Sequence, residues 1–114
     1  MPTLTITESD LIRVGTESRV RQRFARAFPT GLDVPADVDE RKKQAARLFD
    51  AGIDGADVQR LLRDGAFCRY MSAAEAQWKL AETAADRRTA FIDFFRICTE
   101  LALTAYYEQE TAAL

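Results

Sequence analysis

Residues 66–114, AFCRYMSAAEAQWKLAETAADRRTAFIDFFRICTELALTAYYEQETAAL, contain no glycine and no proline, although the chain has five glycines and three prolines before Ala66. Glycine and proline are the residues that most weaken a helix interior, whereas alanine, which occupies twelve of these 49 positions, is the best helix former. The stretch therefore predicts long α-helix, and with it an all-α protein.

Two series of positions seven residues apart form a heptad-like stripe along this stretch. The first series is Ala73, Leu80, Arg87, Phe94 and Leu101, and the second is Gln77, Ala84, Phe91, Cys98 and Ala105. The stripe keeps its phase across residues 86–88, which favours one helix of roughly 38 residues, about 57 Å long. We expect that helix to begin at the capping box Ser72–Glu75. The alternative is a break within residues 83–89, with Thr83 capping a second helix.

The first 65 residues contain the turn signals of several short helices. The predicted helices run to Arg13, from Thr16 or Ser18 to Phe28, from Pro35 or Ala36 to Gly52, and from Asp54 to Gly65. In the third of these we expect Val38, Ala45, Leu48 and Phe49 to face inward. Residues 1–7 alternate threonine with leucine and isoleucine, but no partner strand is evident, so we expect a flexible tail. The sequence thus predicts one domain, residues 1–114, with about five helices: four short N-terminal helices packed on one long C-terminal helix.

The long helix carries apolar residues on a second side, away from Phe94 and Leu101. These are Trp78, Ile92, Leu103 and Tyr107. A helix that is apolar on two faces lies in the centre of a bundle or at an oligomer contact. Because the other helices are short, we expect a homodimer in which the long helices pair. The alternative is a monomeric bundle in which the long helix is broken and folded back.

Arginines on the second predicted helix form the strongest local cluster of charge. Arg19, Arg23 and Arg26 are spaced four and three residues apart and share one face, and Arg41 and Lys42 of the next helix are expected nearby. Guanidinium groups bind carboxylates and phosphates in pairs, so this face is a candidate docking surface for an acidic partner. The simpler interpretation is a solvated helix face.

Residues 44–63 have the outline of a helix-turn-helix, with a turn at Gly52 and Ile53. In that interpretation the second helix would present Gln59, Arg60 and Arg63 to DNA. The match fails at Leu48, because the motif needs a small residue four positions before the turn glycine.

No catalytic set, cofactor motif or metal site is visible. The chain has no histidine, which excludes histidine-based nucleophile systems and metal sites, and its two cysteines, Cys68 and Cys98, are too few for a zinc site. Glycine-rich phosphate loops are missing. We therefore expect no enzyme, no cofactor and no metal, with both cysteines reduced and buried.

The N-terminus has no basic start and no apolar core of a signal peptide, and no apolar run approaches the length of a membrane span. Together with the net charge of −2, these features favour a cytoplasmic bacterial or phage protein that binds another protein, as an adaptor, chaperone or stoichiometric inhibitor. The alternative is a small DNA-binding transcriptional regulator that uses residues 44–63.

Overall fold

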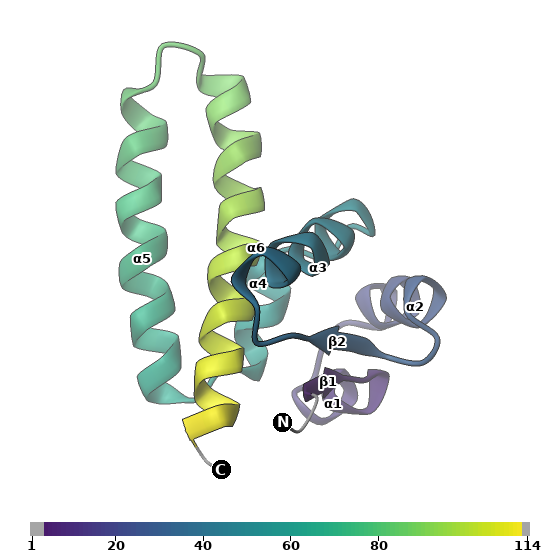
Figure 1. Ribbon diagram of the computed structural model, residues 1–114. Coiled ribbons are helices and arrows are strands. Elements are labelled where there is room, and N and C mark those ends of the chain that lie inside the picture. Colours follow the sequence, from purple (N-terminus) through teal and green to yellow (C-terminus); the bar gives the residue numbers. More distant parts are fainter. Residues whose placement is uncertain (1–3, 113–114) are drawn as a thin grey trace.

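The computed structural model describes residues 4–112, which fold as a helical hairpin standing beside a layer of short elements (Figure 1). The elements, in chain order, are β1 (Leu4–Ile6), α1 (Glu8–Arg13), α2 (Ser18–Ala27), β2 (Leu32–Val34), α3 (Val38–Asp50), α4 (Gly55–Val58), the 3-10 turn η1 (Gln59–Leu61), α5 (Asp64–Thr83) and α6 (Arg87–Ala112). The prediction of an all-α protein, with a long C-terminal helix packed against shorter ones, is confirmed.

The prediction of one continuous helix after Ser72 is wrong, because the chain turns back between α5 and α6 (Figure 1). Ala84 leaves the helix in an extended conformation with ψ of 140°. The Asp86 carboxylate then accepts hydrogen bonds from the backbone N–H and the hydroxyl of Thr89, at 3.2 and 2.9 Å. Folding back lets the apolar stripes of the two halves bury each other, whereas a straight rod would leave both in water.

The start of α5 also differs from the prediction. The helix begins at Asp64 and runs through the expected capping box at Ser72 without a break. Gly65, which we expected to end the preceding helix, lies in the first turn of α5. Since the chain is already helical at Ser72, that residue has no free backbone N–H groups to cap.

The N-terminal segment is a strand from Leu4 onward, and not a flexible tail. β1 pairs antiparallel with β2, with Leu4 opposite Val34 and Ile6 opposite Leu32. Ile6, Leu32 and Val34 are each at most 2% exposed, so the ribbon is anchored by apolar burial as well as by hydrogen bonds. Residues 1–3 of the predicted tail lie outside the described residues.

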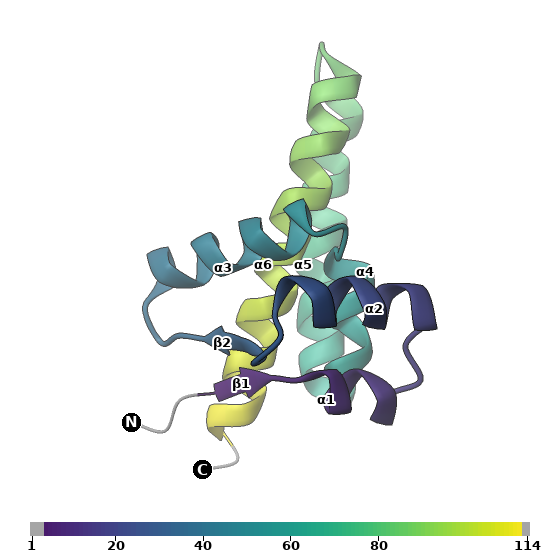
Figure 2. The same ribbon diagram turned by 90° about the vertical axis from the view of Figure 1, so that its right-hand side faces the viewer.

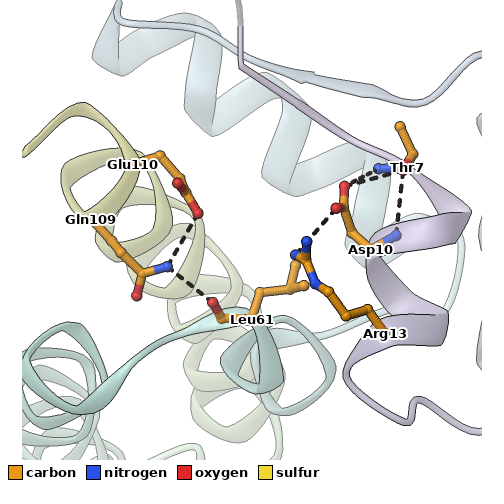
Figure 3. Close-up of polar contacts among 6 residues, drawn as sticks. All are labelled: Thr7, Asp10, Arg13, Leu61, Gln109 and Glu110. Atoms are coloured by element: carbon orange, nitrogen blue, oxygen red, sulfur yellow. Dashed lines mark hydrogen bonds and ion pairs between the residues drawn. The ribbon is translucent and has the colours of Figure 1, made fainter. Parts of the chain in front are cut away.

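α1 and α4 begin at their expected capping residues, Thr7 and Asp54, whereas α3 begins at Val38, after the expected Pro35 or Ala36, because Asp37 caps it. Thr7 and Asp10 form a reciprocal capping box at the start of α1 (Figure 3), and Asp54 and Asp57 form another at α4. In α3, capped by Asp37, the expected inward face is only partly correct. Ala45 and Leu48 are buried, but Val38 is 55% exposed and Arg41 turns inward instead.

The core lies around the C-terminal half of α6, which packs against α5 and also against α3 and α4. Ala102 and Leu103 are completely buried there. Gly55 at the start of α4 lies so close to α6 that a Cβ atom would be 2.7 Å from the Cys98 carbonyl oxygen. Only glycine permits this approach of α4 to the backbone of α6.

Gln109, a buried polar residue near the end of α6, holds the connection between η1 and α5 (Figure 3). Its amide nitrogen donates to the Leu61 carbonyl at 3.0 Å, and its amide oxygen accepts from the Arg63 backbone N–H. One side chain therefore satisfies two backbone groups where the chain leaves the 3-10 turn.

The hairpin projects well beyond α3 and α4, as the view of Figure 2 shows from the side. We call residues 71–97 the distal hairpin, and the described remainder of the chain the base. None of the helices within residues 4–112 combines the length and the apolarity that crossing a membrane requires.

Candidate interaction site

Exposed apolar side chains are concentrated on the hairpin. Eight large apolar side chains of the described residues are exposed, and only Ile12 and Val38 of these lie in α1 and α3. The other six belong to α5 and α6: Phe67, Met71, Trp78, Leu80, Ile92 and Phe95. Single exposed apolar residues are ordinary, but a group of them on one projection marks a candidate contact surface.

Three of the six lie on one face of α5. Phe67, Met71 and Trp78 are four and seven residues apart, so helical geometry places them along one line, which we call the α5 stripe. α5 packs mainly against α6, whereas α6 also packs against α3 and α4. α5 therefore has one covering neighbour and leaves this line of side chains in solvent.

Trp78 is held in place by an aromatic cluster from α6. Its ring stacks on Phe91 with a centroid distance of 5.4 Å and meets the edge of Phe94 at 5.3 Å, and Phe94 meets Phe95 at 5.2 Å. Its indole N–H donates to the Glu82 carboxylate at 2.6 Å. Trp78 remains 40% exposed in spite of these contacts, so it is both fixed in orientation and accessible.

A shallow apolar hollow of about 380 Å³ lies between the side chains of Met71 and Trp78. The buried Ala74 and the ring of Phe94 contribute to its lining, together with Ser72 and Glu75. Because a small residue lies between two large ones on the helix, the surface has a recess that can accept an apolar side chain of another protein.

Charges on the distal hairpin are balanced but unevenly distributed between its helices. α5 contributes Glu75, Lys79 and Glu82, whereas α6 contributes Arg87, Arg88, Asp93 and Arg96, and Asp86 lies in the turn. Two ion pairs lie within the helices: Lys79 with Glu75 at 3.6 Å and Arg96 with Asp93 at 3.9 Å. The remaining charge is negative on α5 and positive on α6.

The predicted arginine face is present on α2. Arg19, Arg23 and Arg26, which we call the arginine stripe, are all exposed, and none of them takes part in an ion pair among the described residues. Lys42 is also exposed.

Arg41 does not belong to this face, because its side chain is only 7% exposed. Its guanidinium donates to the carbonyls of Pro35 and Ala36, at 3.1 and 2.6 Å, and lies 4.7 Å from the ring centre of Tyr107. Arg41 thus holds the start of α3 on α6, and its positive charge is not offered to a partner.

Of the four residues expected to mediate self-association, two are exposed in the structure and two are not. Trp78 and Ile92 are exposed on the distal hairpin, at 40% and 46%. Leu103 is completely buried, and Tyr107 is half-buried beneath Arg41, so both are used inside the protomer. The reason is that α3 packs on the side of α6 that was expected to face another subunit.

The helix-turn-helix outline is present in part. Ile53, Val58 and Leu61 are buried as that outline requires. However, α4 has only four residues before the 3-10 turn, and its first residue, Gly55, is buried against α6. A recognition helix contacts bases with its N-terminal residues. Here the first of these, Gly55, packs against α6, whereas Ala56 is exposed.

The three residues proposed to contact DNA do not extend from a free helix. Gln59 is half-buried, and Arg63 immediately precedes α5. The guanidinium of Arg60 donates to the Gly15 carbonyl at 3.2 Å, which connects η1 with the α1–α2 link.

Two titratable groups inside the base, Tyr70 and Cys98, are buried and have raised pKa values. Burial raises the pKa of Tyr70 to about 12, with smaller contributions from neighbouring Cys98 and Asp54. Burial also raises the pKa of the Cys98 thiol, which therefore stays protonated. No group of three potential ligands placed to hold a metal ion occurs among residues 4–112.

The two cysteines differ from each other. Cys98 is buried as predicted, whereas Cys68 is exposed on α5, and neither forms a disulfide. The prediction that both thiols are buried is therefore wrong for Cys68, because the side of α5 that carries it has no covering element.

Sequence reasoning missed Phe67, Met71, Leu80 and Phe95 as surface residues. Leu80 in particular belongs to the heptad series that we expected to be buried, but it is 64% exposed. The available signal was the alternative of a break within residues 83–89, which is where the chain turns back, although Asp86 and not Thr83 caps the second helix. Such a break implies that α5 and α6 cover only one stripe of each other.

No protein-family model, no curated protein and no solved structure matches this chain. The interpretation of the site therefore depends on the chemistry of its own residues.

Proposed function

We propose that this chain is a non-enzymatic protein-binding protein whose main binding surface is the distal hairpin. The observation that carries the proposal is the exposure of Met71 and Trp78 around a shallow recess, with the exposed Phe95 against Phe94 of its lining. An adaptor, a chaperone and a stoichiometric inhibitor would each act through such a surface.

The composition of the surface supports this proposal. Aromatic residues and methionine are enriched in protein interfaces, and tryptophan is among the residues that most often dominate binding energy. Trp78 is already oriented by Phe91, Phe94 and Glu82, so little side-chain entropy is lost when a partner covers it.

The arginine stripe supports a second contact, with an acidic segment of the partner. Arg19, Arg23 and Arg26 have no carboxylate neighbours in the described chain that would have to be displaced. Each guanidinium can therefore form a paired hydrogen bond with a carboxylate. We also propose a cytoplasmic setting in a bacterium or phage-infected cell, where two unbridged cysteines are ordinary.

The experiment is affinity capture from cells of the source organism with matched variants of the full chain. The test variant is Met71→Glu with Trp78→Glu, and the control is Ile12→Glu with Val38→Glu, which places the same charges on somewhat more exposed apolar positions of the base. We expect a defined protein to be retained by the wild type and the control and lost by the test variant. The proposal is wrong if no captured protein depends on the hairpin.

A second arm tests the arginine stripe and separates a protein partner from DNA. Replacing Arg19, Arg23 and Arg26 together by Glu should abolish capture of an acidic partner, and replacing all three by Lys should weaken it, because lysine lacks the guanidinium fork. Capture that survives nuclease and changes little between about 50 and 200 mM salt favours a mainly apolar protein contact, since phosphate contacts lose affinity by orders of magnitude over that range.

A further inference from the structure

We infer that the distal hairpin pairs with the distal hairpin of a second copy of this chain, and that the two hairpins form a four-helix bundle. This inference rests on the proposed function, because it takes the distal hairpin to be a protein-binding surface. It adds the identity of the bound protein, a second copy of this chain. Three properties of the surface select a second copy.

The first property is that one surface carries both projecting and receiving groups. A two-fold interface uses the same patch on both subunits, so the patch has to be complementary to itself. The recess between Met71 and Trp78 is the receiving part, at about 380 Å³. Phe95, which is 46% exposed on the neighbouring helix and in edge contact with Phe94 of the recess lining, is a projecting side chain of suitable size to enter it.

The second property is the balance of charge. Residues 71–97 contain four carboxylates and four cationic side chains, so two copies of this surface do not repel each other. Beyond the ion pairs Lys79–Glu75 and Arg96–Asp93, the excess is negative on α5, from Glu82, and positive on α6, from Arg87 and Arg88. A pairing that lays α5 of each copy across α6 of the other brings opposite charges together.

The third property is coverage. Within one chain α5 packs mainly against α6, whereas in a four-helix bundle each helix has two neighbours. The distal hairpin projects past α3 and α4, which leaves room for a second hairpin beside it (Figures 1 and 2). Two helices side by side over about 13 residues present roughly 20 Å by 20 Å. This footprint of about 400 Å² is half of the standard interface of about 800 Å² per partner, so the expected dimer is a weak one that forms at tens of micromolar.

Sedimentation equilibrium of the full chain tests the inference directly. We expect a dimer at tens of micromolar, and Trp78→Glu or Phe95→Glu should each raise the dimer dissociation constant by at least about thirtyfold, as loss of an interface hot spot does. The controls Ile12→Glu and Val38→Glu, at 53% and 55% exposure, should leave that constant unchanged. Circular dichroism identifies any variant that fails to fold, and Phe95→Gln with Ile92→Gln then replaces it as a milder change.

Tryptophan fluorescence adds a site-specific readout, because Trp78 is the chain's only tryptophan. Its emission should shift to shorter wavelength as the wild type is concentrated through the dimer transition, and Phe95→Glu should abolish that shift. The control Val38→Glu should retain it.

Three results would overturn the inference: a wild type that stays monomeric at tens of micromolar, a dimer that both hairpin variants leave intact, or a dimer that the base controls disrupt. If the chain is monomeric while hairpin-dependent capture persists, the proposed function stands and the occupant is a different protein. If the hairpin dimerises but no captured protein of another kind depends on it, the inference stands and the proposal that the hairpin binds a different protein is wrong.

Discussion

The base and the distal hairpin are both built of helices, but they bury their side chains to different extents. In the base, large apolar side chains such as Phe24, Leu32 and Leu48 are 1% exposed. In the distal hairpin only Ala74 and Ala81 are buried, and large side chains such as Met71, Trp78 and Ile92 remain 40–46% exposed. The difference arises because α6 is surrounded by several elements in the base, whereas further out it packs mainly against α5, with a contact to α3 where Arg96 lies over the Phe49 ring.

This contrast shows that a regular helical hairpin can form even where its large side chains are only partly buried. The alanine-rich faces of α5 and α6 permit close contact, and the aromatic cluster around Trp78 adds stacking energy. The folding stability of the chain is then expected to reside in the base, leaving the distal hairpin for contacts with other molecules.

The largest expected effect comes from the same change, leucine to alanine, made once in the base and once in the distal hairpin. Leu103→Ala, at a fully buried position of the base, should lower the free energy of unfolding by about 2–5 kcal/mol, because it removes packed atoms and leaves a cavity. Leu80→Ala, at a position that is 64% exposed, should change it by less than about 0.5 kcal/mol. Urea unfolding of both variants at a monomeric concentration measures the difference, and equal losses would contradict the division into two regions.

The next effect concerns alkaline pH, and it acts only on the base. Burial raises the pKa of Tyr70 and of Tyr106 to about 12, with neighbouring carboxylates adding to the shift at Tyr106. Since the folded pKa lies above the unfolded value of about 10, the stabilisation is complete below pH 10 and is lost between about pH 10 and 12. Each tyrosine should account for about 2–3 kcal/mol at the upper limit.

Unfolding in urea at a series of alkaline pH values, followed by circular dichroism, measures that loss. Tyr70→Phe should remove its share of the pH dependence, because phenylalanine does not ionise. Stability that stays flat up to pH 12 in the wild type would show that both phenols are open to solvent.

A smaller effect distinguishes the two glycines on either side of η1. Gly55→Ala should destabilise the chain by about 1–3 kcal/mol, because the added methyl group would collide with the Cys98 carbonyl and the Tyr70 hydroxyl, at 2.7 and 2.8 Å. Gly65→Ala, in the first turn of α5 with no atom closer than 3.7 Å, should stabilise it by up to about 1 kcal/mol. Thermal unfolding of the pair gives the sign of each change, and two changes of the same sign would contradict the packing of α4 on α6.

The smallest expected effect is at the turn of the hairpin. Hydrogen bonds from Thr89 lower the pKa of Asp86, so its carboxylate stabilises the start of α6 above that pKa. Asp86→Ala should speed amide hydrogen exchange around Thr89 and Ala90 while leaving exchange in the base unchanged. Asp86→Asn, which keeps a capping oxygen, should retain most of the protection. Faster exchange throughout the chain would show that the turn is coupled to the core.

The candidate site was only partly accessible to sequence reasoning. Trp78 and Ile92 were identified because they lie on a second apolar side of the helix, and that side does remain exposed in the distal hairpin. Leu103 and Tyr107 belong to the same side but are covered by α3 and Arg41. Periodicity identifies which residues share a face, but it carries no information about how far along that face a neighbouring element extends.

Local chemistry was sufficient for the elements themselves. The absence of glycine and proline after Ala66, the capping residues Thr7 and Asp54, and the turn at Gly52 predict helices at these places, because capping and helix propensity act over a few neighbouring residues. The pairing of Leu4–Ile6 with Leu32–Val34, the reversal at Ala84 to Asp86 and the inward turn of Arg41 depended on the tertiary structure. Each of these is decided by burial against residues distant in sequence, and the free energy of such burial exceeds the local preferences that a sequence pattern records.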